Sequence, residues 1–507
     1  MADRLDAIEL QIMLGSLGAA CDEMGAVLIR AAHSSNIKER RDASTALFDA
    51  DGQMVMQAEH IPVHLGAMPA AVRAVVGERH RAGVAWILND PYAGGTHLPD
   101  ITVVTPVFAR GSLVGFAACR AHHVDVGARR PGSMPADSHT LAEEGVVIDP
   151  QVLDQAAVER LTSRMRQPDE RRADLRAQLA ANAVGALRMR ALAERMGVAA
   201  LRAATDEVLD YGERRTRACL RELDGRARGT RDVLEGPGGD LELTLRAVVE
   251  GGHLTLDFSG SAAQHPGNLN CPLAVTESAC LFALRVLTDP GIPPTAGTQR
   301  AMTVIAPAGS ILNARRPAAV AAGNVETSSR IADMVLTAFG RAQGQGTMNN
   351  LTLGDESFSY YETLGGGQGA SAHGDGASGV HVAMSNTLNT PIESLEREFP
   401  LRVTEYSLRR GSGGAGLQRG GDGVVRELQA LREMEYSLIA ERRRHRPRGA
   451  GGGGPASSGR DTIDGEPVPA KSVGRLRPGQ RLRIETPGGG GFGAGPAPGP
   501  GSRADSL

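Results

Sequence analysis

The sequence predicts an α+β fold of several layers, with mainly antiparallel sheets and a helical section in the middle. Three observations carry this prediction. Apolar and polar residues alternate around turn signals in the first 150 residues and in the last third, strong helix formers fill the stretch after residue 150, and no repeat of fixed period is apparent. Separate runs of strands and helices are typical of the α+β class.

The N-terminal region, residues 1–150, opens with a predicted amphipathic helix at 4–32, where apolar residues recur every three or four positions. Asp51-Gly52 is a hairpin turn signal inside the alternating stretch 46–57. Residues 84–88, 101–108 and 113–119 are predicted strands. The polar motifs between them should therefore lie at strand ends and in tight turns.

A helical section follows at 151–232, rich in Ala, Leu, Arg and Glu. In the C-terminal region, 233–493, Gly251-Gly252 is expected to close an antiparallel hairpin, and 272–288 and 324–343 return to helix. Many of the 65 glycines follow residue 360, which indicates tight turns and close backbone approaches. The Pro, Gly and Ala-rich tail, 494–507, is predicted to be disordered.

Composition excludes several classes of function. A hydrophobic content of 41% and a charged content of 22% describe a soluble globular protein, and the net charge of −3 gives no footprint for nucleic acid or an anionic membrane. No apolar run approaches the ~20 residues that span a bilayer, and no signal peptide is apparent, so we expect a cytoplasmic protein. The five cysteines form no CxxC and are expected to be reduced thiols.

Five groups able to bind metal or transfer protons fall between residues 97 and 125: His97, Asp100, His122, His123 and Asp125. A His-x-x-Asp turn can place a nitrogen and an oxygen on one divalent ion, such as Zn or Mn, although by itself it is more often a hydrogen-bonded turn. If the second segment is extended, its adjacent histidines point to opposite faces, so at most one joins the same ion. Asp125 could then orient a ligand histidine.

Other polar groups allow two interpretations each. Asp42 could be a ligand or a salt bridge, and His60 and His64 could add ligands or line a pocket. The stretch 324–330 starts a helix that could bind an anion or simply be capped. No glycine run matches a nucleotide-binding motif, so the chain shows no recognisable ATP site.

Together these motifs closely resemble the hydantoinase B/5-oxoprolinase family, the B-type half of ATP-dependent hydantoinases, whose relatives include acetone and acetophenone carboxylases. The similarity runs from about residue 5 to 493, with the motifs in order. The segments that carry it are NIKERRD at 36–42, QAEHIPVHLG at 57–66, NDPYAGGTHLPDI at 89–101, AHHVDVG at 121–127, GNVETS at 323–328 and ETPGGGGFG at 485–493.

The resemblance implies one half of a two-component cyclic amide hydrolase. A hydantoinase A-type ATPase subunit would bind ATP and phosphorylate the carbonyl oxygen, and this chain would deliver water and open the ring with the help of a divalent metal, as part of a hetero-oligomer. Carried over by residue, Asp42, His97, Asp100 and His122 look like the metal ligands. His123 and Asp125 are the candidates for acid/base work. The choice between His122 and His123 as ligand stays open.

Two alternatives remain at this stage. The chain could be a subunit of an ATP-dependent ketone carboxylase, in which the activated carbonyl compound meets carbonate. It could also be a non-catalytic scaffold that only stabilises its ATPase partner. The substrate and the metal are not specified by the sequence.

Overall fold

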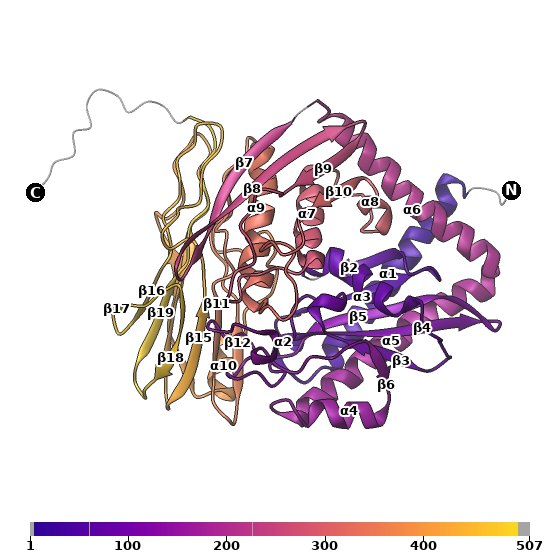
Figure 1. Ribbon diagram of the computed structural model, residues 1–507, viewed down its shortest axis with the longest axis horizontal. Coiled ribbons are helices and arrows are strands. Elements are labelled where there is room, and N and C mark those ends of the chain that lie inside the picture. The colour runs from indigo at the N-terminus through magenta and orange to yellow at the C-terminus, as the bar shows by residue number, and fades with distance from the viewer. Residues whose placement is uncertain (1–4, 60, 226, 495–507) are drawn as a thin grey trace, which may run out of the picture.

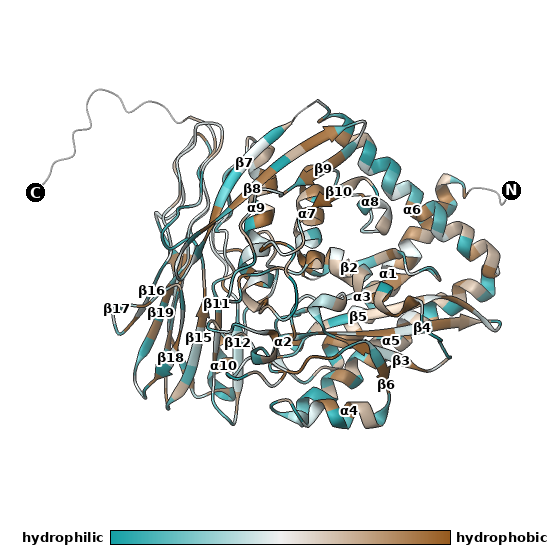
Figure 2. Ribbon diagram, in the orientation of Figure 1, coloured by the Kyte–Doolittle hydropathy of each residue, from teal (hydrophilic) through white to brown (hydrophobic). Residues whose placement is uncertain are grey.

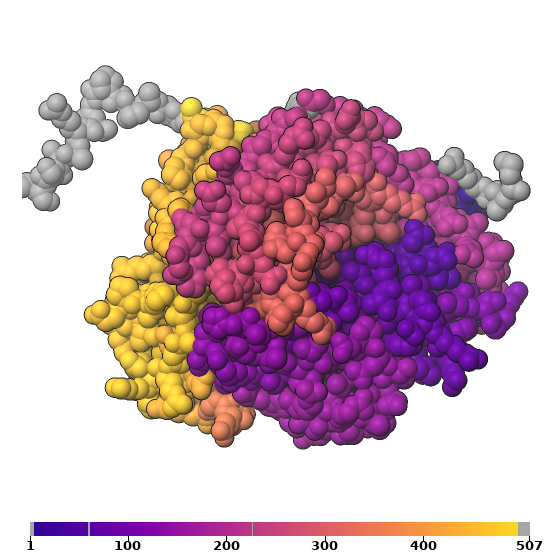
Figure 3. Space-filling model, viewed as in Figure 1, coloured from indigo at the N-terminus to yellow at the C-terminus, as the bar shows by residue number. Residues whose placement is uncertain are grey.

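The computed structural model of the chain describes residues 5–494 apart from 60 and 226. Figure 1 shows the N-terminal half, indigo to magenta, at one end of the molecule and the yellow C-terminal strands at the other. In the space-filling view the yellow surface of the C-terminal strands directly borders the purple and pink surface of the preceding residues (Figure 3). The mixture of helices and mainly antiparallel sheets confirms the predicted α+β fold.

A six-stranded antiparallel sheet forms the centre of the N-terminal half, in the order β2-β1-β5-β4-β3-β6. The Asp51-Gly52 hairpin and the three strands expected before residue 120 are all present. Apolar residues alternate between the two faces, so the sheet contributes to a different core on each side. The strands are β1 (Ala43–Phe48), β2 (Met54–Glu59), β3 (Ala85–Leu88), β4 (Asp100–Ala109), β5 (Ser112–His122) and β6 (Gln151–Leu153).

Helices cover both faces of this sheet. On one face α1 (Ala7–Ala31) and α5 (Pro168–Met196) pack together and against the strands, joined by α6 (Val198–Arg221), while α3 (His64–Val76) covers the opposite face. The predicted helical section thus shares one core with the first sheet, and its predicted boundaries stay predictions. Two short helices, α2 (Ser35–Lys38) and α4 (Gln155–Thr162), complete this half.

Among the described residues, α1 alone is long and apolar enough to cross a membrane by length and composition. This qualifies the expectation that no apolar run approaches that length. Its buried residues, among them Leu17, Cys21 and Met24, belong to the core shared with α5 and the sheet. Packing inside the protein therefore accounts for the apolar character of the helix.

A second layer combines a four-stranded sheet, β10-β9-β8-β7, with helices that continue toward the first half. The Gly251-Gly252 turn joins β8 and β9 as predicted, and α7 packs against both α3 and α9. The elements are β7 (Arg228–Gly236), β8 (Gly239–Glu250), β9 (His253–Asp257), α7 (Leu273–Leu287), α8 (Ala296–Gln299), β10 (Met302–Ile305), the π-helical turn η3 (Gly323–Thr327) and α9 (Ser328–Ala338).

Two antiparallel sheets form the C-terminal end, in the orders β12-β11-β15-β18 and β13-β14-β19-β16-β17, with a shared apolar core. Figure 2 shows teal, hydrophilic residues along the outermost of these strands. The elements are β11 (Asn350–Gly354), β12 (Ser359–Glu362), α10 (Ile392–Glu398), β13 (Leu401–Arg409), β14 (Gly423–Ala430), β15 (Met434–Ile439), β16 (Arg460–Ile463), β17 (Glu466–Pro467), β18 (Lys471–Leu476) and β19 (Arg481–Glu485).

The glycine-rich segments after residue 360 pack backbone against backbone. A Cβ atom on Gly420 would lie 1.8 Å from the carbonyl oxygen of Gly489, and one on Gly413 would lie 1.9 Å from that of Gly420. Only glycine permits such approaches, which agrees with the interpretation of these runs as close contacts. The predicted disordered tail lies outside the described residues except for Ala494.

A buried charge network joins β7, α9 and the segment after β15. Asp232 accepts hydrogen bonds from Arg442 at 3.0 Å and 3.3 Å and from Arg330 at 3.3 Å. Glu441 pairs with Arg330 at 3.0 Å and with Lys471 at 2.6 Å. We call the set Asp232, Arg330, Asp333, Glu441, Arg442 and Lys471 the charge network below.

Candidate metal centre

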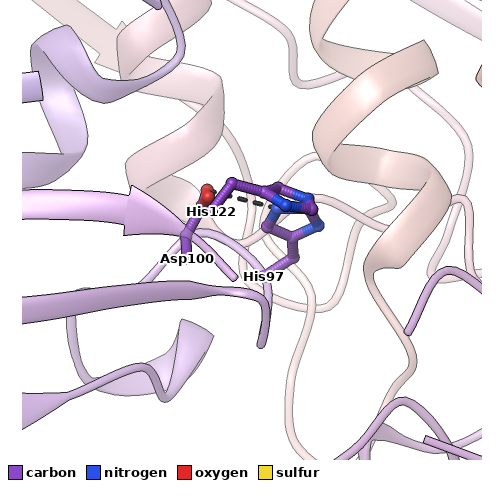
Figure 4. Close-up of side chains that lie close together, drawn as sticks. All are labelled: His97, Asp100 and His122. Atoms are coloured by element: carbon purple, nitrogen blue, oxygen red, sulfur yellow. Dashed lines mark ion pairs between the residues drawn. The ribbon is translucent and has the colours of Figure 1, made fainter. Parts of the chain in front are cut away.

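Three neighbouring strands end at one edge of the first sheet and place acidic and imidazole side chains side by side. Asp100 is the first residue of β4 and is paired with His122, the last residue of β5. Asp42 immediately precedes β1, whose first residue pairs with Ala121 of β5. His97 lies in the tight loop before β4, and Figure 4 shows it with Asp100 and His122 converging on one point. Strand register therefore builds the cluster.

The ligand atoms form two overlapping groups of three, each compact enough to hold one ion. Those of His97, Asp100 and His122 are all within 4.8 Å of one another, and so are those of Asp42, His64 and Asp100. Oδ2 of Asp100 is 3.3 Å from Nε2 of His97 and 3.4 Å from Nε2 of His64. These five side chains, which we call the metal cluster, are at most 6% exposed. Asp100 is its common member.

Several buried atoms of the metal cluster lack hydrogen-bond partners among the described residues. They are Nε2 of His64, both ring nitrogens of His97, Oδ1 of Asp100 and Nε2 of His122. Leaving a buried polar atom unpaired costs about 1–3 kcal/mol, so several in one place call for a missing partner. Imidazole nitrogens with carboxylate oxygens suit Zn or Mn. The residues present therefore fit a divalent cation.

Neighbouring side chains fix the orientation of the histidines. The amide of Asn36 is 2.6 Å from Nδ1 of His122, which leaves Nε2 toward the cluster, and Tyr361 stacks on the same ring at 4.5 Å. The guanidinium of Arg40 lies 4.7 Å above the ring of Tyr361. Nδ1 of His64 is 2.9 Å from the hydroxyl of Ser44. Such contacts select the ring orientation and tautomer of ligand histidines.

Burial and charge set the protonation states in the metal cluster. Burial lowers the pKa of His122 well below its usual range and also lowers the pKa of His64. Burial alone would raise the pKa of Asp100, but His97 and His64 outweigh it and hold that pKa well below its ordinary value. Burial and the neighbouring Asp100 raise the pKa of Asp42 to about 7. Neutral imidazoles beside an ionised carboxylate are the forms that bind metal.

His123 and Asp125, predicted for acid/base work, point away from the metal cluster. Nε2 of His123 is 3.0 Å from Oε1 of Gln178 on α5, on the opposite face of the sheet, and burial lowers the pKa of His123 to about 4. The carboxylate of Asp125 accepts hydrogen bonds from the backbone of Gly127 and Gly132 and pairs with Arg166 at 3.1 Å. Their contacts hold the loop after β5, and their catalytic role stays a prediction.

Two other predictions concern the possible ligands His60 and His64 and the possible anion site at 324–330. His64 belongs to the metal cluster, whereas His60 lies outside the described residues. In the stretch 324–330, Asn324 lies in the π-helical turn η3 that precedes α9. The hydroxyl groups of Ser328 and Ser329 donate hydrogen bonds to backbone carbonyl groups, and Arg330 pairs with carboxylates. The hydroxyl groups and the guanidinium group of this stretch are therefore engaged within the protein.

Distant parts of the chain close the chamber around the metal cluster. Its cavity volume is about 20 Å³. Asn324 contributes a buried Oδ1 atom without a hydrogen-bond partner in the described chain, and it faces the cluster from the π-helical turn. The sequence did not indicate Tyr361 as a site residue, and it indicated Asn324 only as the start of a helix that could bind an anion or be capped. The later lining residues are Asn324, Val325, Met348, Tyr361, Thr363, Met384, Ser385 and Thr387.

The sequence of the whole chain is similar to that of known proteins. Residues 6–495 match the family model described as Hydantoinase B/oxoprolinase. The chain is 39% identical to 5-oxoprolinase 1 of Arabidopsis thaliana, covering 96% of this chain and 41% of that protein. It is 30% identical to a putative B-type subunit of a D-/L-hydantoinase from Pseudomonas sp. (strain NS671), covering 88% of this chain and 82% of that protein. It thus spans about two fifths of the length of the plant oxoprolinase.

Two solved structures share the fold. The ATP-dependent caprolactamase from Pseudomonas jessenii superposes with a TM-score of 0.90 at 27% identity, covering 97% of this chain and 92% of that one. An acetone carboxylase structure gives a TM-score of 0.87 at 18% identity, covering 96% of this chain and 76% of that one. At that identity the second likeness concerns the fold alone.

Proposed function

Because this chain belongs to the hydantoinase B/oxoprolinase family, we propose that it opens the ring of a cyclic amide in an ATP-dependent hydrolase. The observation that carries the proposal is the metal cluster, in which several buried nitrogen and oxygen atoms converge without hydrogen-bond partners among the described residues. The ATP-dependent caprolactamase with the same fold and the related oxoprolinase support the substrate class.

The proposed reaction divides between two subunits. A hydantoinase A-type partner binds ATP and transfers its terminal phosphoryl group to the carbonyl oxygen of the amide, releasing ADP. One water then adds to the carbonyl carbon, the ring C–N bond breaks, and the nitrogen takes a proton and leaves as the amine. A second water hydrolyses the resulting acyl phosphate to carboxylate and phosphate. An unstrained amide is a poor electrophile, so the phosphate group supplies the activation.

Asp42, His97, Asp100 and His122 would hold the divalent ion, Zn or Mn, with His64 beside them. Such an ion would supply Lewis-acid chemistry, making hydroxide available near neutral pH. The chain itself orients the imidazoles through Asn36 and Tyr361. Apolar lining residues such as Ile61, Val63 and Met384 would limit the access of bulk water, which would strengthen electrostatic interactions in the chamber.

The partner is a separate ATPase subunit in this proposal, and the two form a hetero-oligomer in the cytoplasm. The similarity to a protein named as one subunit of a hydantoinase supports a second component. The plant oxoprolinase, of which this chain covers 41%, has further sequence that could fulfil the ATPase role in one polypeptide.

The proposal is tested with the purified chain, an A-type ATPase subunit and ATP, offered 5-oxoproline, hydantoins and lactams. We expect ring opening and phosphate release only when both proteins are present, together with stoichiometric Zn or Mn in this chain by metal analysis. Ring opening that proceeds undiminished without this chain would contradict the proposal.

The same assay separates the two alternatives. Bicarbonate-dependent turnover of a ketone would favour a carboxylase subunit. A non-catalytic scaffold would keep both activity and bound metal after Asp100→Ala, provided that the complex still forms.

A further inference from the structure

The chamber around the metal cluster is too small for the proposed substrate. Its volume of about 20 Å³ is close to the minimum for one water molecule. A five-membered cyclic amide has six heavy atoms and needs several times the ~30 Å³ share of one water. If the proposed function holds, the substrate must occupy space beside the chamber and reach it by movement of a wall.

A cavity of about 560 Å³ adjoins the chamber. Two segments separate the two spaces. Ile61 and Val63 line the chamber while Pro62 lines the large cavity, and Met384 lines the chamber while Ala383 lines the large cavity. Ser385 lines both. The large cavity is therefore one side chain away from the metal cluster.

The wall between the two spaces has features of a movable segment. Ala383 has a φ of 52°, in the left-handed region that residues other than glycine rarely adopt. Strained backbone of this kind is common at ligand clamps and switches. The hydroxyl of Ser385 is 2.6 Å from Nδ1 of His381, which lines the large cavity. One side-chain contact thus connects the wall to the cavity.

The lining of the large cavity suits a small ring that carries an anionic group. Phe282 and Val286 of α7 and Leu336 of α9 give it an apolar side. Arg341, half-buried at its edge, makes no ion pair with any residue that the structure describes. Asp333, the carboxylate in the lining, is already paired with Arg442 at 3.2 Å. The cavity therefore offers one unpaired cation beside apolar surface.

We propose that this cavity, which we call the antechamber, holds the cyclic amide next to the metal chamber, and that Arg341 binds an oxyanion on it. This deepens the proposed function and rests on it. The oxyanion is either a carboxylate on the ring, as in 5-oxoproline, or the phosphoryl group on the activated carbonyl oxygen. Both are planar or branched oxygen groups that a guanidinium binds through paired hydrogen bonds.

The first test compares Arg341→Gln and Arg341→Lys with the wild type, using 5-oxoproline and the uncharged 2-pyrrolidone as substrates. Loss of a charge-assisted contact should lower kcat/KM about tenfold or more in Arg341→Gln, with partial recovery in Arg341→Lys. An effect on 5-oxoproline alone identifies the carboxylate, and an equal effect on both identifies the phosphoryl group. No effect on either overturns the proposal. Arg190→Gln, on the exposed side of α5, is the control and should match the wild type.

A second test measures binding without turnover. Equilibrium dialysis of the metal-loaded chain with labelled 5-oxoproline and with inorganic phosphate should show binding of at least one probe, weakened about tenfold by Val286→Trp at the antechamber. Leu187→Trp, a similarly exposed position on α5, is the matched control. Normal binding of both probes in Val286→Trp and Arg341→Gln, or no binding of either probe by the wild type, would overturn the assignment.

The two proposals fail separately. A wild-type chain that binds a probe through Arg341 but opens no ring with its partner and ATP contradicts the proposed function and leaves the antechamber in place. Ring opening by the wild type, with both antechamber variants indistinguishable from it, removes the antechamber and leaves the proposed function in place.

Discussion

The metal cluster and the charge network are both buried groups of ionisable side chains, yet their atoms are satisfied in different ways. In the charge network, carboxylates and guanidinium groups face each other, and Asp232 accepts four hydrogen bonds from Arg330, Arg442 and Gln343. In the metal cluster, imidazoles and carboxylates meet with several atoms unpaired. The charges of the first are balanced within the chain, whereas the second leaves nitrogen and oxygen atoms of the kind that bind a divalent cation.

This difference distinguishes buried carboxylates that stabilise the fold from buried carboxylates that are arranged for a ligand. A carboxylate surrounded by arginines needs nothing further, so its removal should cost stability. A carboxylate surrounded by histidines with unpaired ring nitrogens is arranged for a ligand, so its removal should cost binding and chemistry. The predictions below test this distinction, beginning with the largest expected effect.

Asp100→Ala should abolish the function of the metal cluster while the protein remains folded. Asp100 is the member shared by both groups of potential ligands, so we expect metal below stoichiometric levels and a loss of ring opening of about a hundredfold or more. Metal analysis and the coupled assay with the ATPase partner measure both. Full metal content in the folded variant would refute the ligand assignment.

Asp232→Ala should act on stability instead. Removing this carboxylate takes one ion-pair partner from each of the buried Arg330 and Arg442, which keep Glu441 and Asp333, so the loss should be up to about 3–5 kcal/mol. Urea unfolding should show the loss, while the folded fraction keeps its metal. A variant that unfolds like the wild type but loses metal would reverse the comparison.

Low pH should reduce the stability that the charge network contributes, because Asp232 becomes protonated. Burial would raise the pKa of Asp232, but Arg330 and Arg442 outweigh burial and lower it. A carboxyl with a depressed pKa in the folded state contributes stability above its unfolded value of about 3.9, and this is lost as the pH falls through the folded pKa. The free energy of unfolding should therefore fall less steeply below pH 4 in Asp232→Asn than in the wild type. Parallel curves would contradict this assignment.

Asn36→Leu should produce the smallest of these effects. Its amide contacts Nδ1 of His122 and donates to the backbone carbonyl of the same residue at 3.0 Å. Loss of an orienting contact to a ligand histidine typically lowers metal affinity about 10–100-fold. Competition with a chelator measures the change. Asp125→Asn, which alters a carboxylate outside the metal cluster, is the comparison and should leave metal affinity unchanged.

Much of the metal cluster could be predicted because its residues are close in sequence and in register. Asp100 and His122 stand on adjacent antiparallel strands, so a short hairpin brings them together. Alternation along an extended segment also indicates that His122 and His123 face opposite ways, although it cannot say which faces the cluster. The structure places His122 there and turns His123 toward α5.

The closing half of the site could not be predicted in the same way. Tyr361 and Asn324 lie more than 200 residues beyond His122, and local patterns do not report which distant segments pack together. The sequence around Asn324 indicates only the start of a helix, because a π-helical turn has no distinctive sequence pattern. The glycine runs correctly indicate close contacts, but their partners depend on tertiary packing.

The β4–β5 pairing also acts as an alignment device for chemistry. A slip of one residue would put His123 opposite Asp100 and send His122 to the face of α5, and it would exchange Phe116 with Ala117 between two separate cores. The same mispairing would thus spoil the site and expose its error through poor packing. The register of the β4–β5 hairpin therefore determines two things together: the packing of the two cores and which histidine lies beside Asp100.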